Sequence, residues 1–394
     1  MSMWKPLVQI ATAVLMISLL GVSVGCKEKS TFKVPDIKII TIDNIHVVQA
    51  VDDNNIWIAS GIGEIYHSGD GGTTWQQQAN PAKKDKILLT SGKFLDTQTG
   101  WMTGLYGTIL HTTDGGTTWQ LQETPTAHTT NSGRSWQLQA TDNETDPPGK
   151  FHLFSVDFVD EQHGWAVGEW NTILRTTDGG TTWQRMTEIK DLVLSNIDMA
   201  DMLHGWIVGE AGLIGHTSDG GATWQRQIPK DFERATFEEE FENPRPSLFC
   251  VQAIDANTAF VCGLEATIMR TTNGGTTWDY MQTESIYALY TLTIANGKGW
   301  AVGDKGAYLV SDDNGETWQL KEGLIKSKQW FRDVSFSSPE KGWVVGQSGV
   351  VASTNDGGAS WQFNSGLSYD MDFFEMPKAL EFRDMPTWGP FARQ

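Results

Sequence analysis

The chain has 394 residues, a formal net charge of -19 and only 20% charged residues. It contains 41 glycines and 18 tryptophans, a composition typical of many short strands joined by tight turns, which argues against a disordered chain. The negative charge favours solubility and disfavours nucleic acid and anionic lipid headgroups as partners.

The first 25 residues predict a signal for export. Lys5 is followed by an apolar run over residues 7–20 and then by small residues. The sequence Ser23-Val24-Gly25-Cys26 is similar to a bacterial lipobox, so we expect a lipid at Cys26 and a location on the periplasmic side of a bacterial membrane. Ser23 stands where such motifs usually have Leu, and this leaves an uncleaved anchor or ordinary cleavage near Gly25 open.

Seven copies of one motif occupy residues 45–363. The copy TTDGGTTW at residues 176–183 recurs with variation, and each copy ends in a tryptophan. Successive tryptophans are 44, 64, 41, 54, 40 and 43 residues apart, so the unit is near 42 residues and insertions fall at 120–150 and 225–247. The seven tryptophans are Trp75, Trp119, Trp183, Trp224, Trp278, Trp318 and Trp361.

Each unit predicts four antiparallel strands, named A to D. A short apolar strand such as GWAVG at 164–168 follows an alternating segment at 154–159 and precedes another at 172–176. Four-stranded sheets of this kind cover one another when arranged radially. The sequence therefore predicts an all-β fold, a seven-bladed β-propeller with four antiparallel strands per blade; a stacked solenoid is the rival architecture. Residues 26–44 are a tether with a strand that could close the ring, and 364–394 an aromatic C-terminal extension.

The motif S/T-x-D-x-G-x-S/T-W is an Asp-box, placed here in the turn between strands C and D. Its carboxylate can accept hydrogen bonds from nearby backbone N–H groups, its glycines permit positive φ, and its tryptophan can be buried between sheets. Asn273 replaces the acid in the fifth copy, and Asn355-Asp356 in the seventh reads as a shift by one place. We predict structural roles, no catalytic residue, no metal and no cofactor for Asp70, Asp114, Asp178, Asp219, Asn273, Asp313 and Asp356.

Two cysteines remain beyond Cys26. Cys250 and Cys262 fall opposite each other on strands A and B of blade five, within reach of a disulfide, and the alternative is two small buried thiols.

Candidate binding residues lie on one rim, where the B-to-C turns and D-to-A connections meet and both insertions emerge. The aromatic and acidic insertion at 237–242 could bind a basic segment or be a solvated loop, and the degenerate motif at 129–136 predicts an extra hairpin. The rim residues are Tyr106, Glu169, Trp170, Glu210, Glu265, Asp304 and Lys305.

The GWAVG strand, the ILRTTDGGTTW-like strand and turn, and the seven copies together resemble the photosystem II stability and assembly factor family, known as Ycf48 or Hcf136. The resemblance implies a seven-bladed propeller in the thylakoid lumen or periplasm, often lipid-anchored, that binds a newly made membrane subunit without catalysis. This chain departs from photosynthetic members, which carry an Arg-rich patch, because it is acidic and has ten arginines. We expect a monomeric envelope lipoprotein that binds a protein partner, in a non-photosynthetic relative.

Two alternatives remain. A sialidase-like glycoside hydrolase would need an arginine cluster, a Tyr–Glu pair and a second carboxylate, and no arginine precedes Arg134. A carbohydrate-binding propeller could use Tyr106 and Trp170.

Overall fold

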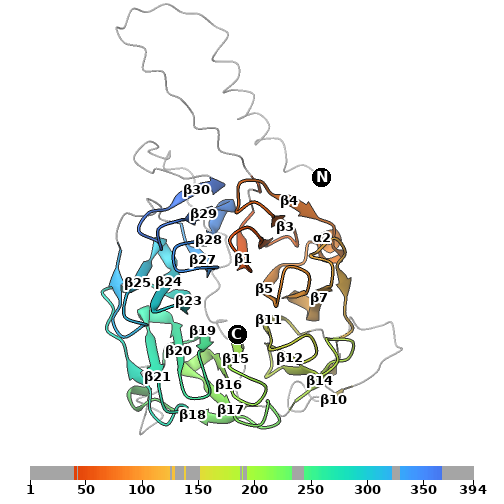
Figure 1. The fold of residues 1–394 in the computed structure, drawn as a ribbon. Helices are drawn as coiled ribbons and strands as arrows, with labels where there is room; N and C mark the ends of the chain where they lie inside the picture. The colour runs from red at the N-terminus through yellow and green to blue at the C-terminus, as the bar shows by residue number, and fades with distance from the viewer. Residues whose placement is uncertain are drawn as a thin grey trace, which may run out of the picture. The chain divides into compact units, whose positions relative to one another are not determined.

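The computed structural model describes residues 40–41, 43–124, 127–128, 137–138, 151–186, 189, 193–232, 244–321 and 329–365. All of them belong to the second of two compact units, residues 37–394. Their strands form seven four-stranded antiparallel sheets arranged around an axis, with one small extra hairpin (Figure 1). The predicted seven-bladed propeller is therefore confirmed.

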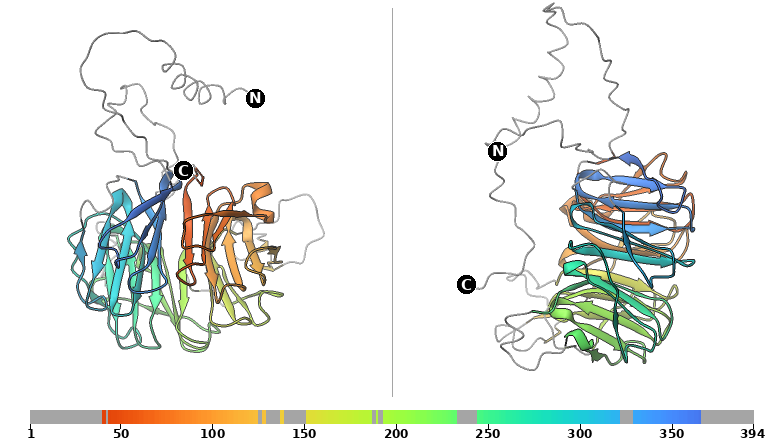
Figure 2. Two further views of the ribbon diagram at one scale, coloured as in Figure 1. Left: turned by 45° about the horizontal axis from the view of Figure 1, so that its top comes forward. Right: turned by 90° about the vertical axis from the view of Figure 1, so that its left-hand side faces the viewer.

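Each blade is one continuous stretch of chain, and its first strand lies nearest the axis (Figure 1). The strands run between the two rims of the ring (Figure 2). Blades one to three comprise β1 (Ile45–Ala50), β2 (Ile56–Ser60), β3 (Ile65–Ser68), β4 (Gln76–Gln78); β5 (Leu89–Phe94), β6 (Gly100–Gly104), β7 (Thr108–Thr112), β8 (Gln120–Leu121); and β11 (Leu153–Phe158), β12 (Gly164–Gly168), β13 (Ile173–Thr176), β14 (Gln184–Arg185). Blades four and five comprise β15 (Leu194–Met199), β16 (Gly205–Gly209), β17 (Ile214–Thr217), β18 (Gln225–Gln227); and β19 (Leu248–Ala253), β20 (Ala259–Gly263), β21 (Ile268–Thr271), β22 (Asp279–Tyr280). Blades six and seven comprise β23 (Leu289–Ala295), β24 (Lys298–Gly303), β25 (Tyr308–Ser311), β26 (Gln319–Leu320); and β27 (Phe331–Phe336), β28 (Gly342–Gly346), β29 (Val351–Thr354), β30 (Gln362–Ser365).

Few other elements interrupt the sheets. Helix α2 (Pro81–Asp85) connects blades one and two, and β9 (Ala127–His128) pairs antiparallel with β10 (Gln137–Leu138) inside the first insertion, as the predicted hairpin requires. Single 3-10 turns follow the second strand in five blades, and a further one is η3 (Lys230–Phe232). No helix among the described residues has the length and apolarity to cross a bilayer.

The core lies between neighbouring blades and is centred on the second strands. All five residues of β6, β12, β16 and β28 are buried, and their tryptophans are fully inaccessible to solvent. The Asp-box tryptophans are less uniform: Trp119, Trp183, Trp278 and Trp318 are buried, whereas Trp75, Trp224 and Trp361 are only partly buried. Stacking adds to this core, since Trp101 lies flat on Phe158 of the next blade with ring centroids 3.6 Å apart.

The Asp-box carboxylates hold their own turns. In the third copy, Asp178 Oδ1 accepts hydrogen bonds from the Thr182 amide at 2.8 Å and the Thr176 hydroxyl at 2.8 Å, while Oδ2 accepts the Thr182 hydroxyl at 2.6 Å. These donors stabilise the charged form, so they hold the pKa of Asp178 below its ordinary value. Gly179 and Gly180 both have positive φ, as the predicted turn requires.

Blades five and seven keep this geometry. Asn273 Oδ1 accepts the Thr277 amide at 2.9 Å, and its Nδ2 donates to the Thr277 hydroxyl at 2.9 Å. The shift read in the seventh copy is wrong, because Asp356 Oδ1 accepts the Ser360 amide at 2.8 Å and occupies the same place as Asp178. Aligning Thr354 with Thr176 puts Asp356 in register.

Side-chain amides join several neighbouring blades at the Asp-box glycines. Gln122 Nε2 donates to the carbonyl of Gly179 at 3.1 Å, and Gln122 Oε1 accepts the indole N–H of Trp183 at 3.2 Å. Gln122 lies three residues after Trp119, the Asp-box tryptophan of its own blade. The same position is Met186, Met281 or Lys321 in three other blades, and there the Asp-box indole N–H of the next blade has no hydrogen-bond partner in the described structure. Those unpartnered indoles belong to Trp224, Trp318 and Trp361.

The ring closes without strand exchange. Asp333 Oδ2 of β27 accepts the Val48 amide of β1 at 2.9 Å, and Ser335 Oγ accepts the Ala50 amide at 3.0 Å. Asp157 and Asp198 make the same kind of bond between blades three and four and blades four and five, to Met199 and Ala253. The described residues before Ile45 add no strand to blade seven, so side chains and packing make this seam.

Of the two alternatives stated for the cysteine pair, the structure does not contain the disulfide. Cys250 and Cys262 are directly opposite in the β19–β20 register, as expected, but both are free buried thiols. Cys262 Sγ donates to the carbonyl of Leu289 at 3.6 Å, and Cys250 Sγ to that of Leu292 at 3.8 Å. Both thiols thus bond toward β23 of blade six, which leaves two small buried thiols, the alternative stated above.

Some predictions fall outside the described residues. They concern the export signal, Cys26 and most of the tether, the acidic insertion at 237–242, the degenerate motif at 129–136 and nearly all of the C-terminal extension.

Candidate functional site

The B-to-C turns carry the predicted rim residues on five successive blades. Four of the turns are η1 (Leu105–Gly107), η2 (Glu210–Gly212), η4 (Leu264–Ala266) and η5 (Asp304–Gly306), and the turn of blade three holds Glu169 and Trp170. Because each turn lies on a different blade, these residues form an arc along one rim and not a single cluster. Such an arc suits an extended partner better than a small substrate.

Two aromatic residues stand out in this arc. Tyr106 is 55% exposed and Trp170 is 45% exposed, and both have positive φ, at 58° and 53°. A bulky side chain rarely adopts this conformation, so each turn is held by its surroundings. His152 Nδ1 accepts the Tyr106 amide at 3.0 Å, and the Arg185 guanidinium donates to the carbonyl of Trp170 at 2.9 Å. The turns therefore present their rings on a fixed backbone.

The charged rim residues have mainly local contacts. Glu169 Oε2 accepts the His152 amide at 3.4 Å, and Asp304 Oδ1 accepts the Lys305 amide at 2.9 Å. Lys305 Nζ lies 5.3 Å from the ring centroid of Tyr287. Glu210 begins η2, and Glu265 has positive φ in the middle of η4.

A second group, which sequence reasoning missed, lies where the first strands begin. We call His46, Phe249, Tyr290, Trp330 and Arg332 the axial collar. The rings of Phe249 and Tyr290 are 5.8 Å apart, the Arg332 guanidinium lies 5.3 Å from the Tyr290 centroid, and His46 is 5.6 Å from Trp330. These contacts pass from blade five through six and seven to blade one, near the axis and on the rim of the B-to-C turns.

A repeated irregularity creates the collar. Each first strand has a register shift after its first residue, so the second residue departs from the regular alternation. That place is aromatic or cationic in five of seven blades, at His46, Phe154, Phe249, Tyr290 and Arg332. Aligning the seven first strands would have shown this signal.

The collar is electrostatically unusual in an acidic protein. Burial lowers the pKa of Arg332, and burial together with the charge of Arg332 lowers the pKa of His46 to about 3, so His46 is neutral. Asp333 follows Arg332, but its two oxygens accept the backbone amides of Val48 and Val334. Arg332 thus offers a partly buried cation on an aromatic face, a setting that suits an anionic group of a partner.

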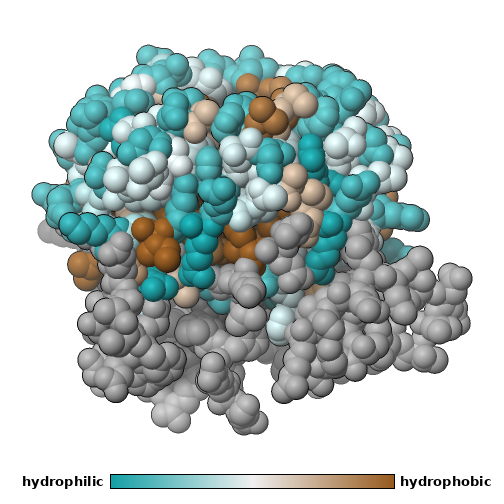
Figure 3. All heavy atoms as spheres, turned by 90° about the horizontal axis from the view of Figure 1, so that it is seen from below, coloured by the Kyte–Doolittle hydropathy of each residue, from teal (hydrophilic) through white to brown (hydrophobic). Residues whose placement is uncertain are grey.

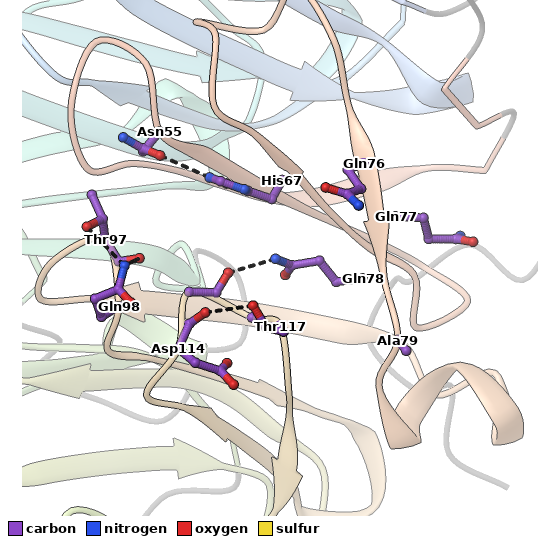
Figure 4. A pocket seen from close by; sticks show the side chains of 12 residues that line it. Asn55, His67, Gln76, Gln77, Gln78, Ala79, Thr97, Gln98, Asp114 and Thr117 are labelled. Atoms are coloured by element: carbon purple, nitrogen blue, oxygen red, sulfur yellow. Dashed lines mark hydrogen bonds between the residues drawn. The ribbon is translucent and has the colours of Figure 1, made fainter.

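The polar cleft beside blades one and two lacks the groups of a hydrolase. It encloses about 380 Å³ between β4 and the second Asp-box, and Asn55, His67, Gln76 and Gln98 line it (Figure 4). Its one lining carboxylate, Asp114, already accepts the Thr118 amide and the Thr112 and Thr118 hydroxyls. The described structure therefore shows no pair of available carboxylates in this cleft.

A Tyr–Glu contact does occur in blade one. The Tyr66 hydroxyl donates to Glu64 Oε2 at 2.9 Å, but burial and this bond raise the pKa of Tyr66, which disfavours a phenolate nucleophile. Among the described residues, no three His, Cys, Asp or Glu side chains are grouped so that they could hold a metal ion.

Comparison with solved structures identifies the same architecture. A structure described as YCF48 bound to D1 peptide is 20% identical, with a TM-score of 0.59 over 81% of this chain and 95% of that chain. YCF48 from Cyanidioschyzon merolae is 16% identical, with a TM-score of 0.60 over 81% and 98%. An ancestral GH74 enzyme is 13% identical, with a TM-score of 0.58 over 83% of this chain and 47% of that one. At these identities the likeness concerns the fold alone.

The family comparison is more specific. No curated protein matches the sequence significantly. The model of the family described as photosynthesis system II assembly factor YCF48 matches residues 133–231, 238–324 and 321–388, which together make up more than half of the chain. The chain therefore belongs to the YCF48 family of photosystem II assembly factors.

Proposed function

We propose that this protein is a non-catalytic scaffold that binds an extended segment of an exported or membrane protein. One observation carries the proposal: the same rim holds two exposed aromatic rings on fixed turns, Tyr106 and Trp170, and a cation in the axial collar, Arg332. Tyr106 and Trp170 would contact apolar side chains of the segment, and Arg332 a carboxylate. Aromatic residues and arginine are the groups that most often dominate protein interfaces.

Family membership supports this assignment. The solved relative whose description names a D1 peptide indicates that a propeller of this family can hold a peptide. That peptide belongs to the relative, which is only 20% identical to this chain, so it does not identify the partner of this chain. We therefore define the partner of this chain by its chemistry: an extended segment with apolar side chains and at least one acidic group near Arg332.

We further propose that the protein acts outside the cytoplasm as a lipid-anchored monomer. The basis is the sequence of residues 1–26, an apolar run that ends at Cys26. A lipid at Cys26 would hold the propeller at the membrane surface, where newly inserted proteins expose their segments. Intact-mass measurement of the mature N-terminus tests this, and an unmodified Cys26 would contradict it.

Binding of the full chain to overlapping synthetic peptides tests the scaffold role. The peptides would cover the extramembrane segments of the host's own membrane proteins. We expect a small set of them to bind, and Tyr106→Ala with Trp170→Ala to weaken that binding at least about tenfold, because each substitution removes an aromatic contact that the partner would bury. Leu121→Ala is the matched control, since Leu121 is also 55% exposed but lies on the outer strand β8. Equal loss in both variants would contradict the assignment.

The same preparations separate binding from catalysis. Hydrolysis of fluorogenic sialosides or β-glycosides above the buffer rate would overturn the non-catalytic role. If the wild type binds glycans but no peptide, and the Tyr106 and Trp170 variant loses the glycan binding, the scaffold role would be replaced by a carbohydrate-binding role.

A further inference from the structure

The opposite rim, formed by the A-to-B turns and the Asp-boxes, carries an apolar feature that the fold does not require. Met202 and Leu203 form the tip of the A-to-B turn of blade four, and they are 46% and 52% exposed. Ten large hydrophobic side chains are exposed among the described residues, and Met202 and Leu203 are the only two of them that are adjacent in sequence. The wall seen in Figure 3 is mostly hydrophilic, with hydrophobic groups between the hydrophilic residues.

The other blades serve as internal controls for this tip. The hydrogen bonds that hold the turn use only backbone atoms of Leu203. Asp201 Oδ1 accepts the Leu203 amide at 2.7 Å, and the carbonyl of Leu203 accepts the Gly220 amide at 2.9 Å. Blades one, two and three make the same carbonyl bond with two polar residues at the tip, and blade five makes it with an alanine and an asparagine. The corresponding pairs are Asp53–Asn54, Thr97–Gln98, Glu161–Gln162 and Ala256–Asn257.

The neighbouring blade has a further exposed apolar residue in its own A-to-B turn. Ile254, the first residue after β19, is 40% exposed. Asp198 of blade four accepts the Ala253 amide at 2.7 Å, which places the start of this turn beside blade four. We call Met202, Leu203 and Ile254 the rim patch.

A carboxylate adjoins each member of the rim patch: Asp201 precedes Met202, Asp255 follows Ile254, and Asp219 precedes the Gly220 whose amide is bonded to Leu203. Asp219 and Asp255 are exposed, and hydrogen bonds from Thr223 to Asp219 and from the Asn257 and Thr258 amides to Asp255 lower the pKa of both, so both are charged at neutral pH. Asp201 is exposed as well; although burial raises its pKa, hydrogen bonds from His204 and Leu203 lower it overall. The nearby Arg175 is directed onto the ring of Trp165, 5.8 Å from its centroid.

We propose that the rim patch docks a basic peptide segment whose central apolar side chains lie on Met202, Leu203 and Ile254. Charge complementarity selects this occupant, because the three carboxylates attract lysine or arginine and repel anionic lipid headgroups. The patch lies on the rim opposite the site proposed above and does not depend on it. The protein would therefore have two independent contact faces.

Fluorescence anisotropy with a defined probe tests the proposal. The probe is a labelled peptide with a central Leu–Leu pair between lysines, and its counterpart has glutamate in place of lysine. We expect the lysine probe to bind the full chain and the glutamate probe not to bind. Met202→Ser with Leu203→Ser should weaken binding about tenfold, while Glu161→Ser with Gln162→Ser, the equivalent tip of blade three, should leave it within about twofold. Asp255→Asn, which can still cap its turn, should reduce the salt dependence of binding.

Several results would overturn the proposal: no binding of the lysine probe, equal binding of both probes, or equal loss in the two tip variants. Binding of the chain to phosphatidylglycerol vesicles that is lost in the Met202 and Leu203 variant would assign the patch to a membrane instead. Tyr106→Ala with Trp170→Ala should not affect the probe, so failure here is distinguishable from failure of the scaffold role.

Discussion

The side-chain amide of Gln78 donates a 2.7 Å hydrogen bond to the carbonyl of Gly115 in the next blade. The same side chain accepts the indole N–H of Trp119 through Oε1 at 3.1 Å. One glutamine thus pairs with two polar groups of a neighbouring Asp-box, the indole of the buried Trp119 and the carbonyl of the partly buried Gly115. Through this glutamine, the Asp-box of blade two, whose carboxylate fixes its own turn, also takes part in the contact with blade one.

Replacing Gln78 with Ala should destabilise the protein. The Trp119 indole and the Gly115 carbonyl would lose their partner between blades, and a buried unsatisfied polar group costs about 1–3 kcal/mol. Urea unfolding followed by tryptophan fluorescence measures the change. Gln76→Ala is the control, because Gln76 is an exposed residue of the same strand; similar losses in both variants would contradict the role of Gln78.

Two substitutions of one Asp-box residue should separate the effect of losing a hydrogen-bond acceptor from the effect of losing a charge. Asp178→Ala removes the acceptor of three hydrogen bonds and should lower the free energy of unfolding by about 1 kcal/mol or more. Asp178→Asn should cost clearly less, because Asn273 already supports the same turn in blade five. Paired unfolding curves for the two variants test this. Equal destabilisation would mean that the charge itself matters.

The seam between blades seven and one should respond to pH through Asp333. Burial raises its pKa to about 7, whereas an unfolded Asp titrates near 4. Between these values the folded chain holds a proton that the unfolded chain has lost, so lowering the pH in this window stabilises the fold. Relative to Asp333→Asn, we expect the free energy of unfolding of the wild type to rise by about 1–3 kcal/mol from pH 8 to pH 5. A flat or opposite difference across a pH series of urea unfolding curves would exclude this.

The cysteine pair of blade five should be chemically silent in the folded protein. Burial raises the pKa of Cys262 well above its usual value, and although the hydrogen bond from Cys262 lowers the pKa of Cys250, both thiols are buried and shielded from reagents. We expect a maleimide reagent to label Cys250 and Cys262 only after unfolding. A native mass lower by two hydrogens, with no labelling after unfolding, would show an oxidised pair instead.

The repeat made the blades predictable. Each unit carries its own strand alternation, its own Gly-rich turn and its own capping carboxylate, and these are local properties of residues such as Thr176, Asp178 and Gly180. The rim assignment followed as well, since strand direction alone places Tyr106 and Trp170 on the rim that carries the D-to-A connections. The shift read at Asp356 failed only through an error of alignment.

The contacts between blades were not predictable in the same way. The Gln78 bridge, the collar around Arg332 and the direction of the Cys250 and Cys262 thiols each depend on side chains from units about 40 residues apart in sequence. No local pattern states which atoms will meet, because the answer depends on how tightly neighbouring sheets pack.

The amino-acid sequence by itself determined a propeller of seven blades, because the motif period and the turn chemistry repeat within each unit. Only the tertiary structure decided how the ring closes, which polar groups are satisfied and where cations and exposed apolar side chains gather. Those outcomes come from the radial arrangement, which brings the same position of successive units side by side around one axis and so turns small differences between repeats into distinct surfaces.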